Sequence, residues 1–155
     1  MPDPNFTPPQ AEVRDTPKPK GSAIKGVLAG LAVDVAGTVA FGVLLSVTYG
    51  AILAASGQGE QEIRAALAEG DSNSIFTAIG VVGGCAFSIL GGYVCERVAR
   101  QRNYRAGAVL GGVSVALGLV LGAVSLPWAE NLLLAFLTVG SVLLGTRLAL
   151  ERHPL

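Results

Sequence analysis

The sequence contains few charged residues and few of the residue types that carry metal or redox chemistry. Charged side chains make up 14% of its 155 residues, whereas a typical soluble domain carries about 25%. Its single histidine, His153, is two residues from the C-terminus, where we expect it to be solvated. Cys85 and Cys95 are ten positions apart within one apolar segment, too far along a helix for a disulfide and without the company of other metal ligands. The sequence therefore predicts no metal centre and no disulfide.

Motifs for nucleotide binding and covalent catalysis are also missing. The chain has no Walker loop, no dinucleotide-binding fingerprint and no nucleophile motif. Its basic residues are divided among separate short segments and form no continuous patch of the kind that binds nucleic acid. We therefore expect a protein that is not an enzyme, needs no cofactor and has no nucleic-acid partner.

What the sequence has in abundance is long apolar segments. Hydrophobic residues make up 51% of the chain, 21 residues are glycine, and the mean hydropathy is +0.56. Four apolar segments cover residues 24–53, 75–95, 106–126 and 131–150, and about 20 such residues are enough to cross a bilayer as a helix. The pattern predicts an all-α integral membrane protein whose domain, residues 24–155, is a bundle of four transmembrane helices in the lipid bilayer.

The positions of Lys and Arg indicate how these helices are oriented. Ten of the eleven lie in three places: at or before the start of the first segment, between the second and third, and at the end of the fourth. Because cytoplasmic loops of membrane proteins are enriched in basic residues, both termini are predicted to be cytoplasmic, in the inner membrane of a bacterium. Residues 1–23, with six of the eight prolines and no apolar run, are predicted to form a disordered cytoplasmic tail.

The loop between the first two segments has a helical composition over residues 60–68. Ile63 and Leu67 fall on one face of such a helix because they are four positions apart. We interpret this segment as a short linker helix along the outer membrane interface. A lid over an outward-facing cavity is the alternative.

Small residues recur at four-residue spacing within the apolar segments. In a membrane, such a stripe lets two helix backbones approach closely, which is a main source of contact energy between helices in lipid. The spacing predicts glycine-zipper packing of the bundle. The residues assigned to this packing are Gly30, Gly42, Gly80, Gly84, Ser88, Gly92, Gly111, Gly118 and Gly122.

Asp34 is an ionisable residue inside the first apolar segment. It lies nine residues beyond Lys25, which is about 14 Å along an α-helix and places it near the middle of the membrane. No basic residue is predicted at that depth, and hydrocarbon favours the neutral form of a carboxyl group. Asp34 and Thr38, one turn later, are therefore a candidate proton or cation site. The alternatives are a structural hydrogen bond from Asp34 to a hydroxyl or carbonyl of a neighbouring helix, and a pairing with another protein.

A family resemblance includes the same carboxylate. Residues 34–38 read Asp-Val-Ala-Gly-Thr. They resemble the first-helix motif of the small multidrug resistance transporters, in which an acidic residue is followed three and four positions later by Gly-Thr. The resemblance implies a four-helix protein that works as a dimer, with Asp34 exchanging protons for cationic drugs. The chain differs from that family in having Asp in place of Glu, and in lacking the Lys that follows the motif and the aromatic residues of the substrate site.

A second resemblance covers the end of the second segment and the start of the third. Residues 91–100, followed by residues 106–112, are similar to a helix-loop-helix passage of small uncharacterised four-helix bacterial inner-membrane proteins. The resemblance implies a membrane location and carries no activity. Glu96 lies in this passage and is predicted to form a structural ion pair, either with Arg100 at i, i+4 spacing or with Arg147 across helices.

Two classes of function are consistent with these features. The first is a non-catalytic membrane protein, a scaffold or accessory subunit whose glycine faces bind further copies of the chain or a larger membrane complex. The second is a small proton- or cation-coupled transporter that uses Asp34. A single intramembrane carboxylate with few polar residues around it makes a poor substrate pocket, so the sequence favours the first class.

Overall fold

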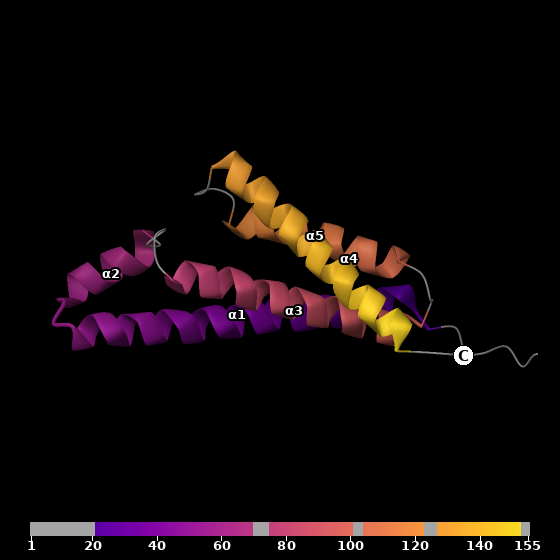
Figure 1. The fold of residues 1–155 in the computed structure, drawn as a ribbon, viewed down its shortest axis with the longest axis horizontal. Helices are drawn as coiled ribbons and strands as arrows, with labels where there is room; N and C mark the ends of the chain where they lie inside the picture. Colours follow the sequence, from indigo (N-terminus) through magenta and orange to yellow (C-terminus); the bar gives the residue numbers. More distant parts are fainter. Residues whose placement is uncertain (1–20, 70–74, 101–103, 123–126, 153–155) are drawn as a thin grey trace, which may run out of the picture.

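The computed structural model describes residues 21–69, 75–100, 104–122 and 127–152, in which the regular elements are five α-helices (Figure 1). They are α1 (Ala23–Ala55), α2 (Glu60–Glu69), α3 (Ile75–Ala99), α4 (Arg105–Gly122) and α5 (Trp128–Glu151). The prediction of an all-α protein is confirmed for this part of the chain. Residues 1–20 of the predicted disordered tail lie outside the described residues.

Three of these helices are long and apolar enough to span a membrane, namely α1, α3 and α5. With 33 residues, α1 is about 50 Å long and exceeds the roughly 30 Å thickness of a hydrocarbon core. α4 is apolar but shorter over its described residues. The predicted third span extends to residue 126, and residues 123–126 lie outside the described part of the chain. A membrane span at α4, and with it the total of four spans, therefore stays a prediction.

The helices form two pairs that meet at one end. α1 and α3 lie side by side and antiparallel, and α5 crosses α3 at an angle with α4 beside it (Figure 1). The start of α1, the end of α3, the start of α4 and the end of α5 come together at one end, which we call the closed end. At the opposite end, the open end, the α4–α5 pair diverges from the α1–α3 pair (Figure 1).

The buried core lies at the closed end. Its residues are Cys95, Ala99, Ala106, Leu110 and Val142, with Val27 and Leu31 packed against them. They come from α1, α3, α4 and α5, which we call the four long helices to distinguish them from the short α2. All four therefore share this core. α3 and α4 each pack against the other three helices, and the contacts of α3 with α1 and α5 are the most extensive.

Glycines bring the helix backbones together in this region. A Cβ added at Gly30 of α1 would lie 2.6 Å from the carbonyl oxygen of Gly91 in α3. One added at Gly92 of α3 would collide with the backbone of Val142 in α5, and Gly145 of α5 meets the backbone of α3 in the same way. Close van der Waals contacts of this kind are what stabilises a helix bundle in a membrane, where lipid provides no hydrophobic driving force between helices.

The other small residues assigned to helix packing lie in different surroundings. Gly111 is in ordinary van der Waals contact with Val139. A Cβ added at any of four others would meet no atom within 4 Å: Gly42, Gly80, Gly84 and Gly118. The side-chain surroundings of Gly122 lie outside the described part of the structure. Four residues of an α-helix turn about 40° more than a full circle. Residues at four-residue spacing therefore shift gradually around the helix and do not all face the same neighbouring helix.

The helix predicted over residues 60–68 is confirmed as α2. α1 ends before Gly57, whose φ of +86° lies in the left-handed region that glycine adopts without strain. A Cβ added at Gly50 would lie 3.8 Å from both Ile63 and Leu67. The predicted apolar face of α2 therefore packs on the last turns of α1, and among the described helices α1 is its only neighbour.

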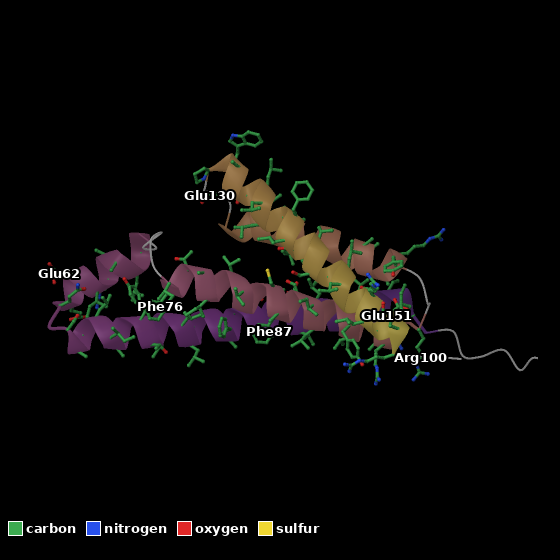
Figure 2. All side chains as sticks on the ribbon, viewed as in Figure 1. Glu62, Phe76, Phe87, Arg100, Glu130 and Glu151 are labelled. Atoms are coloured by element: carbon green, nitrogen blue, oxygen red, sulfur yellow. The ribbon has the colours of Figure 1, made fainter. Side chains whose placement is uncertain are left out.

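Charged side chains gather at the two ends of the helices. Figure 2 shows Glu62 and Glu130 toward the open end and Arg100 and Glu151 at the closed end. This separation is expected for helices whose middle lies in hydrocarbon. Asp34 is an exception, because it lies within α1 and is only 5% exposed.

Candidate functional site

Asp34 lies where α1, α3 and α4 face one another. The hydroxyl of Ser88 in α3 donates a hydrogen bond to Asp34 Oδ1 at 2.8 Å. The hydroxyl of Ser114 in α4 donates to Asp34 Oδ2 at 2.6 Å. Both distances are normal for a hydroxyl that donates to a carboxyl group. Each oxygen of the buried carboxyl group therefore has a donor, and the two donors come from different helices.

Glycines create the space for this arrangement. A Cβ added at Gly91 would lie 3.0 Å from the Cβ of Asp34, so a larger residue there would press on the carboxylate. One turn before Asp34, Gly30 lies against the same part of α3. Asp and Ser both have short side chains, and the hydrogen bond between Asp34 and Ser88 forms because these glycines let α1 and α3 approach closely.

Two aromatic rings close the α1–α3 interface beyond Asp34. A Cβ added at Gly37 of α1 would collide with the ring of Phe87 in α3, and one added at Gly83 of α3 would collide with the ring of Phe41 in α1. The two ring centroids are 6.1 Å apart. The labelled Phe87 in Figure 2 lies along this pair of helices. Space beside Asp34 is therefore found toward α4 and α5 and not between α1 and α3.

A cavity of about 280 Å³ lies on that side of Asp34, and all four long helices contribute to its lining. Its polar lining residues are Asp34, Thr38, Cys85, Ser88, Ser114 and Thr138. The other described lining residues are apolar or glycine, and Asp34 is the only charged one among them. The cavity has room for several water molecules, and its hydroxyl groups supply the polar partners that such waters need.

The structure places some polar residues of this site as the sequence predicts and others in surroundings that the sequence did not predict. Thr38 lines the cavity with Asp34, as the sequence suggests, whereas Ser88, assigned to helix packing, donates a hydrogen bond to Asp34. Ser114 was not singled out from the sequence. A signal for it exists: Ser114 is nine residues beyond Arg105, as Asp34 is nine beyond Lys25. Since α1 and α4 both begin at the closed end, the two residues lie at similar depth.

The predicted ion pair of Glu96 lies outside this site, at the closed end. Glu96 is buried, with 5% of its surface exposed. Arg147 Nε donates a hydrogen bond to Glu151 Oε1 at 2.7 Å, within α5. The pairing of Glu96 with Arg100 or Arg147 stays a prediction.

The ligand chemistry around Asp34 is that of oxygen. Among the described residues, no group of three His, Cys, Asp or Glu side chains is placed to hold a metal ion. The cavity instead offers one carboxylate and several hydroxyl groups, and such hard ligands suit protons and hard cations. A single negative charge in a low-dielectric site is balanced by one proton or one monovalent cation.

Comparisons with known proteins add nothing to the interpretation of the site, which therefore rests on its geometry. No protein-family model, no curated protein and no solved structure matches the chain.

Proposed function

We propose that this chain is a four-span protein of a bacterial inner membrane with both termini in the cytoplasm, and that it is a small proton- or cation-coupled transporter. Asp34 is the coupling site in this proposal. The observation that carries it is the buried carboxylate of Asp34 on the wall of a cavity to which all four long helices contribute. The sequence favours a scaffold because polar residues are sparse, but the fold gathers hydroxyl groups from α1, α3, α4 and α5 around this one carboxylate.

The two serines suit a group that gains and loses a proton. When Asp34 is ionised, both hydroxyl groups donate to it, as in the observed geometry. When Asp34 is protonated, its own O–H donates to one serine, whose hydroxyl then turns to a water in the cavity, because a hydroxyl both donates and accepts. Neither state leaves a buried carboxyl oxygen without a partner, so the exchange avoids the cost of a lost buried hydrogen bond.

The size of the cavity supports a small ligand. The cavity beside Asp34 measures about 280 Å³, close to the lower end of the range of about 300–1,000 Å³ that is usual for drug-sized ligands. A proton, or a monovalent cation with part of its water shell, fits this volume.

The test is proton uptake into liposomes that contain the purified protein and a trapped pH-sensitive dye, with the membrane potential clamped by potassium and valinomycin. Asp34→Asn keeps the shape of the side chain and removes its titratable proton. We expect uptake by Asp34→Asn to fall to the rate of protein-free liposomes while its thermal stability in detergent stays close to that of the wild type. Asp34→Glu should retain part of the uptake.

The matched control is Glu130→Gln, which removes an exposed carboxylate in the first turn of α5. It should take up protons as the wild type does. If Asp34→Asn is folded and supports uptake at the wild-type rate, with protons and with a sodium or potassium gradient alike, the coupling role of Asp34 is refuted.

A second function, a scaffold or accessory subunit, is supported by the outer surface of α1. Gly42 lies on an exposed part of this helix between the exposed Val39 and Val43, and a Cβ added there would meet no atom within 4 Å. In lipid, a small residue on such a face lets a helix of another copy or of a larger complex approach. Gly42→Leu should then reduce oligomer formation, measured by cross-linking in native membranes, and an unchanged cross-linking pattern would contradict this function.

A further inference from the structure

A second cavity adjoins the one beside Asp34. It measures about 240 Å³, lies between α4 and α5, and shares Ser114, Gly118, Leu134 and Thr138 with the first cavity. Its lining extends to Asn131, in the first turn of α5. The two cavities are therefore adjacent, and the residues that line them extend from Asp34 to the first turn of α5.

The second cavity leads toward the open end of the bundle. Asn131 precedes Thr138 by seven residues, which is about 10 Å along α5. Next to Asn131, Trp128 is 76% exposed and Glu130 lies at the open end in Figure 2, as expected for residues at the headgroup level. The α4–α5 pair diverges from α1 and α3 at this end (Figure 1).

The opposite direction is filled by packed side chains. Cys95, Leu110 and Val142 are each 0% exposed and come from three different helices. At the same end, Gly92 and Gly145 lie in close backbone contact with the facing helices. In the described structure, the two cavities thus extend from Asp34 toward the open end, and a close-packed core lies toward the closed end. A groove of about 440 Å³ between the first turns of α1 and α4 shares no lining residue with either cavity.

We propose that the two cavities form one hydrated route, along which protons or small monovalent cations reach Asp34 from the open-end face of the membrane. The junction supports hydration, because Ser114 and Thr138, which both carry hydroxyl groups, line both cavities and buried water requires polar partners. The identity of the ion that moves along the route rests on the proposed function. The experiment that tests the route measures the modification of a cysteine and involves no transport assay.

The chain offers a residue that blocks this route and a matched control. Gly118 lines both cavities, and a Cβ added there would meet no atom within 4 Å, so the side chain of Gly118→Leu has room to extend into the space that both cavities border. Gly112 is on the same helix, is exposed and also has open space at its Cβ. It does not line either cavity. Gly112→Leu therefore adds the same side chain to α4 outside the route.

A native cysteine reports on access. Cys85 lines the cavity beside Asp34, whereas Cys95 is 0% exposed. We would treat sealed vesicles of each orientation with a small, charged, membrane-impermeant methanethiosulfonate reagent and measure modification by mass spectrometry. Cys85→Ser defines the background, and a cysteine introduced at Trp128 identifies the open-end face.

We expect Cys85 to be modified from the open-end face in the wild type and in Gly112→Leu, and modification to fall to the Cys85→Ser background in Gly118→Leu. Equal modification in the two leucine variants, no modification of the wild type, or faster modification from the closed-end face would each overturn the route. These outcomes do not depend on the Asp34→Asn uptake experiment. Loss of the proposed function and loss of the proposed route are therefore distinguishable.

Discussion

Gly92 and Gly84 provide a direct test of the helix packing, because they lie eight residues apart on α3 in the same four-residue ladder. The structure places them in opposite surroundings. A methyl group added at Gly92 would collide with the carbonyl of Val142 in α5, whereas one added at Gly84 would meet no atom within 4 Å. Gly92→Ala and Gly84→Ala therefore make the same chemical change with different steric consequences.

The expected magnitude follows from two opposing effects. Replacing glycine by alanine inside a helix gains about 1 kcal/mol of helix propensity, and this gain is common to both variants. Overpacking costs about 1–3 kcal/mol and applies to Gly92→Ala alone. The cost is not relieved by a rotamer change, because the atom that the new methyl group meets belongs to the backbone of α5. We therefore expect Gly92→Ala to be less stable than Gly84→Ala by about 1–3 kcal/mol.

The difference can be measured by reversible unfolding in mixed micelles, with an increasing fraction of sodium dodecyl sulfate and circular dichroism as the readout. The free energies of unfolding of the wild type and the two variants are compared in the same lipid–detergent mixture. If Gly92→Ala and Gly84→Ala have equal free energies of unfolding, the close crossing of α3 and α5 is refuted.

Two further predictions concern the site and the orientation of the chain. Ser88→Ala and Ser114→Ala each remove one hydrogen bond to Asp34 and should lower the free energy of unfolding by a similar amount, about 1–3 kcal/mol for a buried group that loses a partner. Ser114→Ala should slow proton uptake into liposomes more than Ser88→Ala does, because Ser114 lines both cavities and Ser88 lines one; equal slowing would contradict this. Cysteines at Ala66 and Trp128 should react with an impermeant reagent from outside the cell and a cysteine at Arg100 only from inside. Reaction at Trp128 from the inside alone would contradict the proposed topology.

The presence of helices that are long and apolar enough to span a membrane is readable from the sequence. A helix satisfies its own backbone hydrogen bonds in hydrocarbon, so length and apolar composition are enough to identify it. α1, α3 and α5 follow from this rule, and the short helix α2 follows from the spacing of its apolar residues. Asp34 also stands out from sequence alone, because a carboxylate within an apolar helix is rare and costly.

The neighbours of each residue were decided by the tertiary structure. Gly84 and Gly92 share one spacing pattern, yet only Gly92 lies at the crossing with α5. The hydroxyl groups of Ser88 and Ser114 come within hydrogen-bond distance of Asp34 only when three helices pack together. Spanning a membrane is a local property that each segment satisfies by itself. A site or a cavity between helices depends on crossing angles and contacts between distant segments, and these follow from the packing of the whole bundle.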